Sequence, residues 1–291
     1  MTEIAGRTAL ITGGASGIGL LMGRMLLERG AARLIVWDAS VANIETARAT
    51  LDPLGAVVFN RVEVSDTEAV LAAVAGLEAD RMVIDLLINN AGIVVGKPFL
   101  EHGHADIDRT IAINTGALMH LTRALLPSMA VHGRGHVVNI ASAAALVSNP
   151  NMSVYAASKW AVMGWSDSLR QELERSGTDI RVTSVLPYYI HTGMFDGVRS
   201  RLIPILQPED VARRILRAIE RDAVFLHMPA IIRLLPLLRG LLPTRALDFV
   251  LNRIFGVASS MDNFRGRDET AKDVREPGGG RLLRASRSRH S

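Results

Sequence analysis

Short apolar runs alternate with longer amphipathic segments through the first 226 residues, and this pattern predicts strands and helices in turn. The apolar runs are rich in Val, Ile and Leu, which is typical of strands buried on both faces. They predict strands at 8–12, 33–37, 56–62, 85–89, 136–141, 180–186 and 223–226. The amphipathic segments predict helices at 19–29, 41–51, 66–77, 105–131, 154–176 and 208–221.

A helix between successive strands predicts right-handed crossovers, which produce a parallel sheet covered on both faces. We therefore expect an α/β fold: a doubly wound, seven-stranded parallel sheet of the Rossmann type, in a single domain spanning residues 1–264. In such a sheet, ligands bind in a crevice at the carboxyl ends of the strands. Functional residues are expected to gather there.

Residues 229–255 form an apolar C-terminal extension of this domain, predicted to be helical. Its most apolar part, residues 229–243, contains three prolines together with Arg233 and Arg239, and it is shorter than the roughly 20 residues that span a bilayer. Three roles are open. The extension is a lid over the substrate cleft, an interface with a second subunit, or a peripheral membrane contact in which the two arginines reach lipid phosphates.

The excess positive charge of the chain lies near its C-terminus. The 291 residues include 33 Lys and Arg against 29 Asp and Glu, but eight of the basic and four of the acidic residues lie in 265–291. The remaining 264 residues are therefore neutral. The Gly-, Arg- and Ser-rich end predicts a disordered basic tail, and the neutral body predicts no nucleic-acid partner.

The sequence contains no cysteine, which excludes disulfides, cysteine nucleophiles and thiolate metal sites and is compatible with a reducing compartment. The N-terminus has no basic region followed by a long apolar run, so no signal peptide is expected. His102, His104, His132 and His191 show no metal-ligand spacing with acidic partners. We expect a cytoplasmic protein without a metal site.

A glycine-rich loop, Thr-Gly-Gly-Ala-Ser-Gly-Ile-Gly from Thr12 to Gly19, directly follows the first predicted strand. Glycines allow a tight turn and a close approach to a pyrophosphate, and the next helix offers free N–H groups and the positive end of its dipole. A tight turn without a ligand is the alternative. The position after the first strand, together with the acidic residue described next, favours a dinucleotide site.

Asp38 ends the second predicted strand, about 20 residues beyond the loop. A carboxylate there accepts hydrogen bonds from both ribose hydroxyls of an adenosine, and it repels a 2′-phosphate. Neither Ser16 in the loop nor Ala39 after the acid supplies a cation for that phosphate. We predict NAD rather than NADP as the cofactor, and an N-cap for the next helix is the alternative role of Asp38.

Ser142 follows the fifth predicted strand, and Tyr155 and Lys159 stand four residues apart in the next helix. This spacing places the phenol and the ammonium on one helix face. A cation within about 4–6 Å lowers the pKa of a phenol by roughly 1–3 units, so Tyr155 is expected to act as an acid or base. Ser142 is expected to hydrogen-bond the substrate oxygen.

Residues 5–226 resemble the short-chain dehydrogenase/reductase family, because the motifs of that family occur here in the same order. These are the glycine loop, Asp38, an Asn-Asn-Ala-Gly sequence at 89–92, Asn114, the Ser142, Tyr155 and Lys159 group, and the segment 187–192. The resemblance implies a catalytic group in which Asn114 supports a proton relay through water behind Lys159. It implies a homodimer or homotetramer formed by the helices that begin near residues 105 and 154. The cofactor-binding residues that it implies are Gly13, Ser16, Gly17, Ile18, Gly19, Asp38, Glu63, Val64, Asn90, Ala91, Gly92, Tyr155, Lys159, Pro187, Ile190 and Thr192, the last at the nicotinamide carboxamide.

Two positions depart from the family pattern. Glu63 stands where the family usually has Asp beside the adenine, which puts the adenine contacts in doubt, and Tyr188 replaces the usual Gly after the proline at 187. The segments 187–197, 208–210, 227–229 and 261–262 resemble the branch of epidermal retinol dehydrogenases and related hydroxysteroid dehydrogenases, whose members act on lipophilic alcohols. The excess of arginine over lysine is typical of a GC-rich genome and favours a bacterial member. With Ser142, the residues expected to line an apolar substrate pocket are Tyr188, Tyr189, Met194 and Phe195.

We therefore expect an oxidoreductase that transfers a hydride between NAD(H) and a secondary or lipophilic alcohol or ketone. One alternative is an NAD-binding regulatory or scaffold protein on the same fold, since a fold does not determine a function. Such a protein needs the glycine loop but not Ser142, Tyr155 and Lys159 together. A second alternative is a family enzyme that catalyses dehydration or epimerisation.

Overall fold

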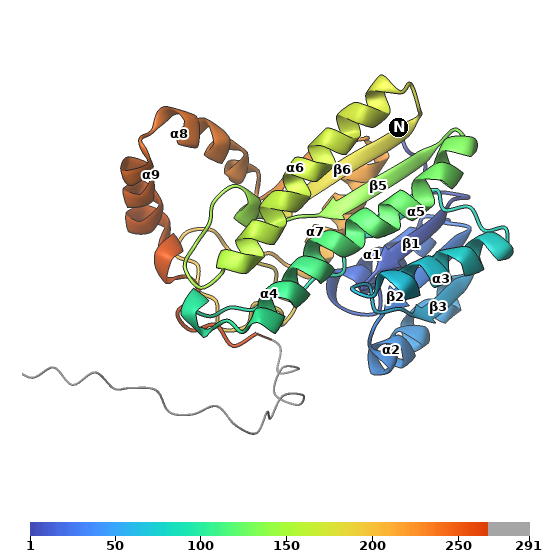
Figure 1. Cartoon of the computed structure of the whole chain (residues 1–291), viewed down its shortest axis with the longest axis horizontal. Helices are drawn as coiled ribbons and strands as arrows, with labels where there is room; N and C mark the ends of the chain where they lie inside the picture. Colours follow the sequence, from blue (N-terminus) through green and yellow to red (C-terminus); the bar gives the residue numbers. More distant parts are fainter. Residues whose placement is uncertain (267–291) are drawn as a thin grey trace, which may run out of the picture.

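The fold is built on seven parallel strands, seen in a computed structural model that describes residues 1–266. The predicted tail therefore lies almost entirely outside the described residues. The strands follow the order β3-β2-β1-β4-β5-β6-β7 in the sheet, which is the doubly wound arrangement expected from the sequence (Figure 1). Their bounds are β1 Thr8–Thr12, β2 Arg33–Asp38, β3 Val57–Arg61, β4 Leu86–Asn89, β5 Gly135–Ile140, β6 Ile180–Pro187 and β7 Phe225–Met228.

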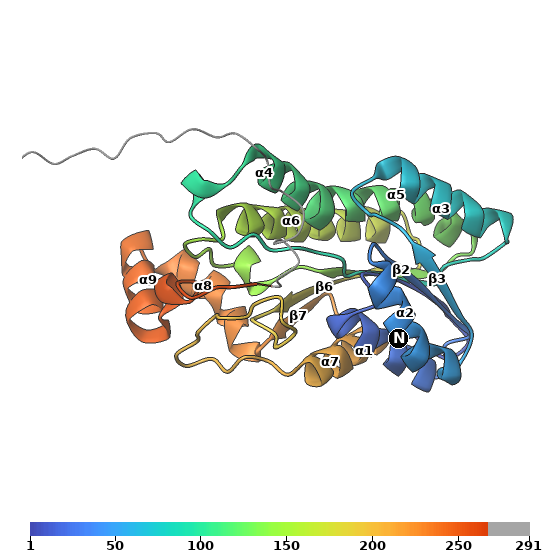
Figure 2. The same cartoon turned by 90° about the horizontal axis from the view of Figure 1, so that it is seen from below.

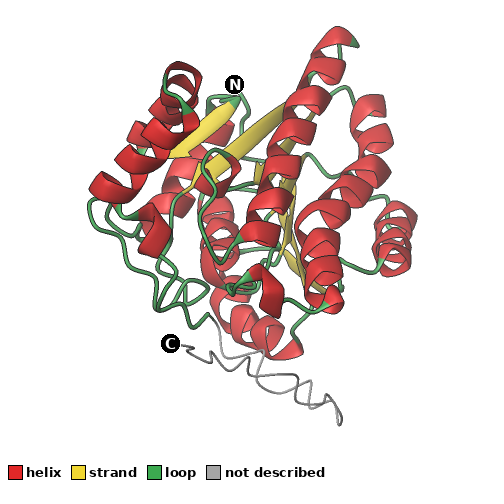
Figure 3. Cartoon of the chain, turned by 60° about the vertical axis from the view of Figure 1, so that its left-hand side comes forward, coloured by secondary structure: helices red, strands yellow, loops and turns green. Residues whose placement is uncertain are grey.

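Helices cover both faces of the sheet, as Figures 2 and 3 show. One face carries α3 (Thr67–Ala79), α4 (His104–Ile111), α5 (Ala117–Val131) and α6 (Ser153–Arg175). The other face carries α1 (Gly17–Glu28), α2 (Val41–Leu51) and α7 (Pro208–Glu220). Because strand side chains alternate between faces, Leu10 belongs to the core under α3 and α5, and its neighbour Ile11 belongs to the core under α1 and α7.

One predicted helix, 105–131, is interrupted in the structure. Its beginning is α4 and its end is α5, and a π-helical turn at Ala112–Gly116 joins the two. A π-turn holds one extra residue per turn and is frequent at functional sites. Asn114 lies at the centre of this turn and is fully buried. The interruption therefore turns a polar side chain into the protein interior.

The C-terminal extension folds into short helices beside the carboxyl ends of β6 and β7. It contains α8 (Leu235–Leu241) and α9 (Thr244–Val250), which Figure 1 shows at one end of the molecule. Short 3₁₀ or π turns lie at Ala230–Leu234, Leu251–Phe255 and Val257–Ser259, and elsewhere at Asp52–Leu54, Phe99–Glu101 and Ala143–Ala145. Within residues 1–266, no helix combines the length and apolar character needed to cross a membrane.

Candidate functional site

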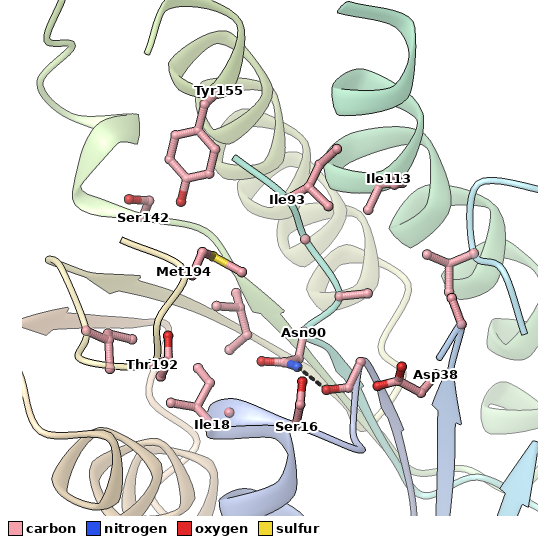
Figure 4. Close-up of a pocket in the computed structure, with 18 of the residues that line it drawn as sticks. Ser16, Ile18, Asp38, Asn90, Ile93, Ile113, Ser142, Tyr155, Thr192 and Met194 are labelled. Carbon is pink, nitrogen blue, oxygen red and sulfur yellow. Dashed lines mark hydrogen bonds between the residues drawn. The ribbon is translucent and has the colours of Figure 1, made fainter. Parts of the chain in front are cut away.

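A long cleft opens at the carboxyl ends of the strands, where the sequence predicts the functional residues. Nineteen of the predicted cofactor, catalytic and substrate residues line it, and Gly19, Asn114 and Tyr189 do not. In Figure 4, Tyr155 and Ser142 stand at one end of the cleft, Ser16 and Asp38 stand at the other, and Met194 lies between them. Residues that the prediction missed also line the cleft: Ala39, Ser40, Asn43, Val62, Ile93, Arg109, Ile113, Ile140 and Ala141.

The glycine loop at the end of β1 is shaped by positions that only glycine fits. Gly13 and Gly17 have φ of 60° and 52°, in the left-handed region that other residues rarely adopt. A Cβ at Gly19 would collide with the Gly13 carbonyl oxygen, so Gly19 shapes the loop from behind instead of lining the cleft. The Asn90 amide, which follows β4, donates to the Thr12 and Gly13 carbonyl oxygens at 3.0 Å each. The loop is therefore fixed before any ligand binds.

The N-terminus of α1 faces the cleft without a side-chain cap. Ser16 is the N-cap residue, but its hydroxyl makes no capping hydrogen bond. The first N–H groups of a helix have no partner inside the helix, and the helix dipole adds partial positive charge at this end. This terminus can therefore bind a pyrophosphate directly.

Asp38 at the end of β2 is almost buried and holds two loops together. One carboxylate oxygen accepts from Ala15 N in the glycine loop at 3.2 Å, and the other accepts from Ser40 N at 3.0 Å. The N-cap of α2 is Ser40, whose hydroxyl accepts from Asn43 N, so the alternative role considered for Asp38 is wrong. The carboxylate still lines the cleft at the position expected for an adenosine ribose.

The far end of the cleft lies between β3 and α4. Glu63 is exposed, and its carboxylate accepts from the Ser65 backbone N–H and hydroxyl at 3.2 and 2.8 Å. Arg109 reaches this cleft from α4, one helical turn before Ile113. Arg109 and Ile113 stand four residues apart and therefore lie on one face of the predicted helix 105–131. This spacing is the signal by which the sequence could have indicated that both residues line the cleft.

Ser142, Tyr155 and Lys159 meet at the end of β5. The Ser142 and Tyr155 side chains lie next to each other (Figure 4), and Lys159 Nζ lies 5.7 Å from the Tyr155 ring centroid. Burial raises the pKa of Tyr155 to about 12, and a hydrogen bond with Ser142 opposes only part of this rise. Burial also lowers the pKa of Lys159 to about 8. The expected lowering of the phenol pKa by Lys159 is therefore wrong for this structure, because desolvation outweighs the neighbouring charge.

Two further contacts fix this group in place. Lys159 Nζ donates to the Ile140 carbonyl oxygen at 2.8 Å, and the Ser142 hydroxyl accepts from Ala144 N at 3.1 Å.

Asn114 does not reach the cleft. Its amide accepts from Ile93 N at 2.8 Å and donates to the Ile93 carbonyl and the Ser158 hydroxyl, so it ties the strand end after β4 to α6. Ser158 immediately precedes Lys159, so Asn114 is linked to the helix of the catalytic candidates through Ser158.

A second cavity of about 170 Å³ adjoins the catalytic end of the cleft. It shares Ser142, Tyr188 and Phe195 with the cleft, and its other walls are mainly apolar. Tyr189, predicted as a substrate residue, lines this cavity and not the cleft. The C-terminal extension forms one wall of the cavity with Ile231, Ile232, Leu234, Leu235, Leu238, Leu251 and Phe255.

Arg239 of α8 holds the C-terminal extension against the rest of the domain. Its guanidinium lies over the Trp160 ring, 4.6 Å from the ring centroid, and donates to the Leu146 carbonyl oxygen at 3.3 Å. Trp160 immediately follows Lys159 on α6. The contact therefore joins the wall of the apolar cavity to the helix that carries the catalytic candidates.

The residues present fit a nicotinamide dinucleotide. The cleft offers a glycine loop at a helix N-terminus for a pyrophosphate, a carboxylate for a ribose and a buried Tyr–Lys pair at the opposite end. The cleft runs along the carboxyl edge of the sheet, and residues at or after the ends of β1, β2, β4, β5 and β6 line it. An elongated ligand with separate phosphate, ribose and ring parts suits this distribution.

Known proteins match the chain over most of its length. A model of the short chain dehydrogenase family matches residues 7–202. The chain is 33% identical to epidermal retinol dehydrogenase 2 of Mus musculus, with 91% of this chain and 87% of that protein covered. It is 32% identical to estradiol 17-beta-dehydrogenase 11 of Rattus norvegicus, with 87% of this chain and 85% of that protein covered. These matches confirm the predicted family and its retinol and hydroxysteroid dehydrogenase branch.

Solved structures agree with this result. A short chain dehydrogenase/reductase from Burkholderia phymatum in complex with NAD has a TM-score of 0.74 and 28% identity, covering 82% of this chain and 95% of that chain. A metagenomic short-chain oxidoreductase in complex with NADP has a TM-score of 0.65 and 28% identity, covering 78% of this chain and 96% of that chain. The chain therefore belongs to the short-chain dehydrogenase/reductase family of oxidoreductases.

Proposed function

We propose that this protein is an NAD(H)-dependent alcohol dehydrogenase and ketone reductase for lipophilic substrates. The observation that carries the proposal is the position of Ser142, which lines both the dinucleotide-shaped cleft and the apolar cavity. Tyr155 stands beside it at the end of the cleft. A substrate carbon held in the apolar cavity would meet the cofactor at this junction.

The chemistry of the chain's own residues is a proton transfer at the substrate oxygen. Ser142 hydrogen-bonds that oxygen, and Tyr155 accepts its proton during oxidation or donates it during reduction. When bound, a nicotinamide would supply the hydride acceptor or donor, and its oxidised form would add positive charge to the site. Burial raises the Tyr155 pKa, and the Lys159 ammonium and this added charge would both oppose that rise and favour the phenolate. Only the cofactor's charge differs between its two forms, so proton acceptance by Tyr155 would be favoured in the oxidation direction.

The choice of NAD over NADP rests on Asp38. Its carboxylate is fixed in the cleft by two backbone N–H groups, so it cannot swing away from a 2′-phosphate. Arg61, the β3 residue that pairs with Asp38 in the sheet, donates from Nε to the Ala39 carbonyl at 3.4 Å and is exposed outside the cleft lining. The solved relatives include complexes with NAD and with NADP, so the carboxylate is the feature of this chain that supports NAD.

The apolar cavity supports a lipophilic alcohol or ketone as the substrate. Retinol and estradiol appear in the names of the relatives and are lipophilic alcohols, which agrees with such a cavity. Of the three roles open for the C-terminal extension, we favour the lid, because seven of its residues line the cavity and Arg239 is engaged with Trp160. A homodimer or homotetramer, a cytoplasmic location and a peripheral membrane contact stay predictions.

A screen of alcohol oxidation tests the proposal. NADH formation would be followed with retinol, estradiol, secondary aromatic alcohols and medium-chain alcohols, each supplied with NAD or with NADP. We expect turnover with NAD on at least one bulky apolar alcohol and lower turnover on short-chain alcohols. Absence of turnover on every alcohol and on the corresponding ketones, with NADH binding intact, would contradict the proposal.

A further inference from the structure

The apolar cavity contains a polar cluster that the proton transfer at Ser142 does not use. Asn149, Tyr189 and Ser260 come from three distant parts of the chain, and all three line the cavity. The Tyr189 and Ser260 side chains are buried, at 8% and 3% exposure. Buried polar groups cost free energy unless they are hydrogen-bonded, so a cluster in an otherwise apolar wall calls for a reason.

The hydrogen bonds within the cluster use up its donors. Ser260 donates its hydroxyl proton to the Val257 carbonyl oxygen at 2.8 Å. The Asn149 amide nitrogen donates to the Ser260 hydroxyl at 3.1 Å and to the Tyr189 hydroxyl at 3.0 Å. The Tyr189 proton goes to the Ser260 oxygen at 3.1 Å or to the Met152 sulfur at 3.8 Å. The Ser260 proton is given to a carbonyl, so an amide oxygen of Asn149 facing Ser260 would meet a second acceptor. The network therefore favours the amide nitrogen on the side of Ser260.

This orientation leaves one acceptor without a partner. Asn149 Oδ1 makes no hydrogen bond to any group within residues 1–266, and it is not sealed away from the space around it. An amide oxygen can accept a hydrogen bond but cannot donate one. The free capacity of the cluster therefore suits a hydroxyl or N–H group of a ligand, and it does not suit a carboxylate, an ether or a second ketone.

The cluster and the catalytic end are joined by a short chain of aromatic rings. Tyr155 contacts Phe195 edge-on, with ring centroids 6.0 Å apart, and Phe195 contacts Tyr189 at 5.1 Å. Phe195 and Ser142 both line the cavity that holds the cluster. A single substrate can therefore place its reacting carbon at Ser142 and a second polar group at Asn149, with an apolar body between them.

We propose that Asn149, oriented by Tyr189 and Ser260, selects lipophilic alcohols that carry a second hydrogen-bond donor at a distance from the reacting carbon. The inference rests on the proposed function, and it adds to that function a requirement on the substrate, namely a second hydrogen-bond donor. An apolar substrate without this donor would leave the amide oxygen desolvated and unpartnered. A site built to pair with a substrate hydroxyl discriminates against the analogue that lacks it.

Diols of graded length test the proposal. The terminal diols of butane, hexane, octane, decane and dodecane would each be compared with the primary alcohol of the same chain, by kcat/KM with NAD. In a wholly apolar cavity the second hydroxyl is a penalty at every length. We expect the ratio of diol to alcohol to rise well above two, the value that two equivalent reacting hydroxyls alone would give, at one intermediate length. In Asn149→Leu the ratio at that length should fall by about tenfold or more. The monomethyl ether of the best diol, which cannot donate, should lose the advantage in the wild type.

Two further variants keep the test decisive. Ser260→Ala frees one N–H of Asn149, so the cluster gains a donor, and the monomethyl ether should recover relative to the diol. Ser200→Ala is the matched control, because it removes the hydroxyl that contacts Tyr188 at 3.1 Å and leaves the cluster intact. The diol preference should persist in this control. Each variant would first be checked for NADH binding and for a cooperative thermal unfolding transition.

The outcomes separate this inference from the proposed function. A diol ratio no higher than two at every length in the wild type, or a ratio unchanged in a folded Asn149→Leu, would overturn the role of Asn149. If neither alcohols nor diols are oxidised, the proposed function fails for these probes. The inference is then tested by the thermal shift that each diol and alcohol gives to the NADH-loaded protein, where equal shifts would overturn it.

Discussion

Asp38→Asn is the substitution that should change cofactor preference with the least change of shape. The carboxylate accepts from Ala15 N and Ser40 N, and its side chain is 8% exposed. The amide keeps one acceptor oxygen, so one of these two hydrogen bonds is lost. This loss weakens the glycine loop for both cofactors equally, and it cancels when NAD and NADP are compared.

The difference between the cofactors comes from the lost charge. Two unit charges about 4 Å apart at an effective dielectric of about 20 repel by about 4 kcal/mol, and screening by water in the open cleft reduces this repulsion to about half. A ribose hydroxyl that donates to a charged acceptor contributes about 1.5–3 kcal/mol, of which the amide retains a part. Together these effects shift the preference by about 3 kcal/mol, or roughly a hundredfold in the ratio of kcat/KM for NAD to that for NADP.

The assay is kcat/KM with each cofactor and one saturating alcohol, supported by fluorescence titration of NADH and NADPH. Glu63→Gln is the matched control, because it removes a carboxylate from the same cleft that is turned toward Ser65. We expect this control to change the ratio by less than about threefold, since its charge is exposed and screened. A wild type that prefers NADP, or equal ratios in Asp38→Asn and the wild type, would refute the reasoning.

Three other substitutions test separate parts of the account. Lys159→Met should abolish turnover yet raise the free energy of unfolding in urea at neutral pH by about 1–2 kcal/mol. Burial lowers the folded-state pKa of this lysine from 10.5 to about 8, so its charge destabilises the folded state below pH 8. This destabilisation disappears as the pH rises toward 10.5. Equal unfolding free energies of the variant and the wild type at neutral pH would contradict this prediction. Arg239→Met should raise KM for bulky apolar alcohols by about 5–20-fold and KM for small alcohols by less than twofold, because it removes the contacts that hold the lid. Arg245→Met, at an exposed position of α9, is the control and should change neither KM. An equal rise of both KM values in Arg239→Met would argue against a lid. Gly19→Ala should abolish NADH binding in a folded protein, since its Cβ meets the Gly13 carbonyl, and normal binding by fluorescence would count against the loop geometry.

The sheet and the cleft could be predicted from the sequence because both depend on local patterns. The buried strands are mainly apolar runs. The glycine loop and Asn90 directly follow strand ends and Asp38 is the last residue of β2, and a parallel sheet brings these positions to one edge. The π-turn around Asn114 could not be predicted, because hydrophobic periodicity does not register one extra residue in a buried helix. That turn sets the side chain of Asn114 toward Ile93 and Ser158.

Long-range packing determined what the sequence could not show. The apolar character of the C-terminal extension was evident, but its partner was not, because the contact of Arg239 with Trp160 joins residues that no local pattern relates. The same packing decides that Tyr188 lines both the cleft and the cavity, whereas Tyr189 lines the cavity and not the cleft. The Tyr155 pKa was predicted in the wrong direction because the spacing to Lys159 is local, whereas the burial of both groups is a property of the whole fold.

In the proposed reaction a hydride passes between an alcohol carbon and NAD while Tyr155 exchanges the proton. This reaction is tested most directly with an alcohol from the screen carrying deuterium on its reacting carbon, followed by mass spectrometry of the reduced cofactor. The wild type should transfer the label to NADH, and Tyr155→Phe should bind NADH but transfer the label at least about 10²-fold more slowly. Unlabelled NADH from the wild type, or near-normal label transfer by Tyr155→Phe, would show that the proposed proton and hydride transfer is wrong.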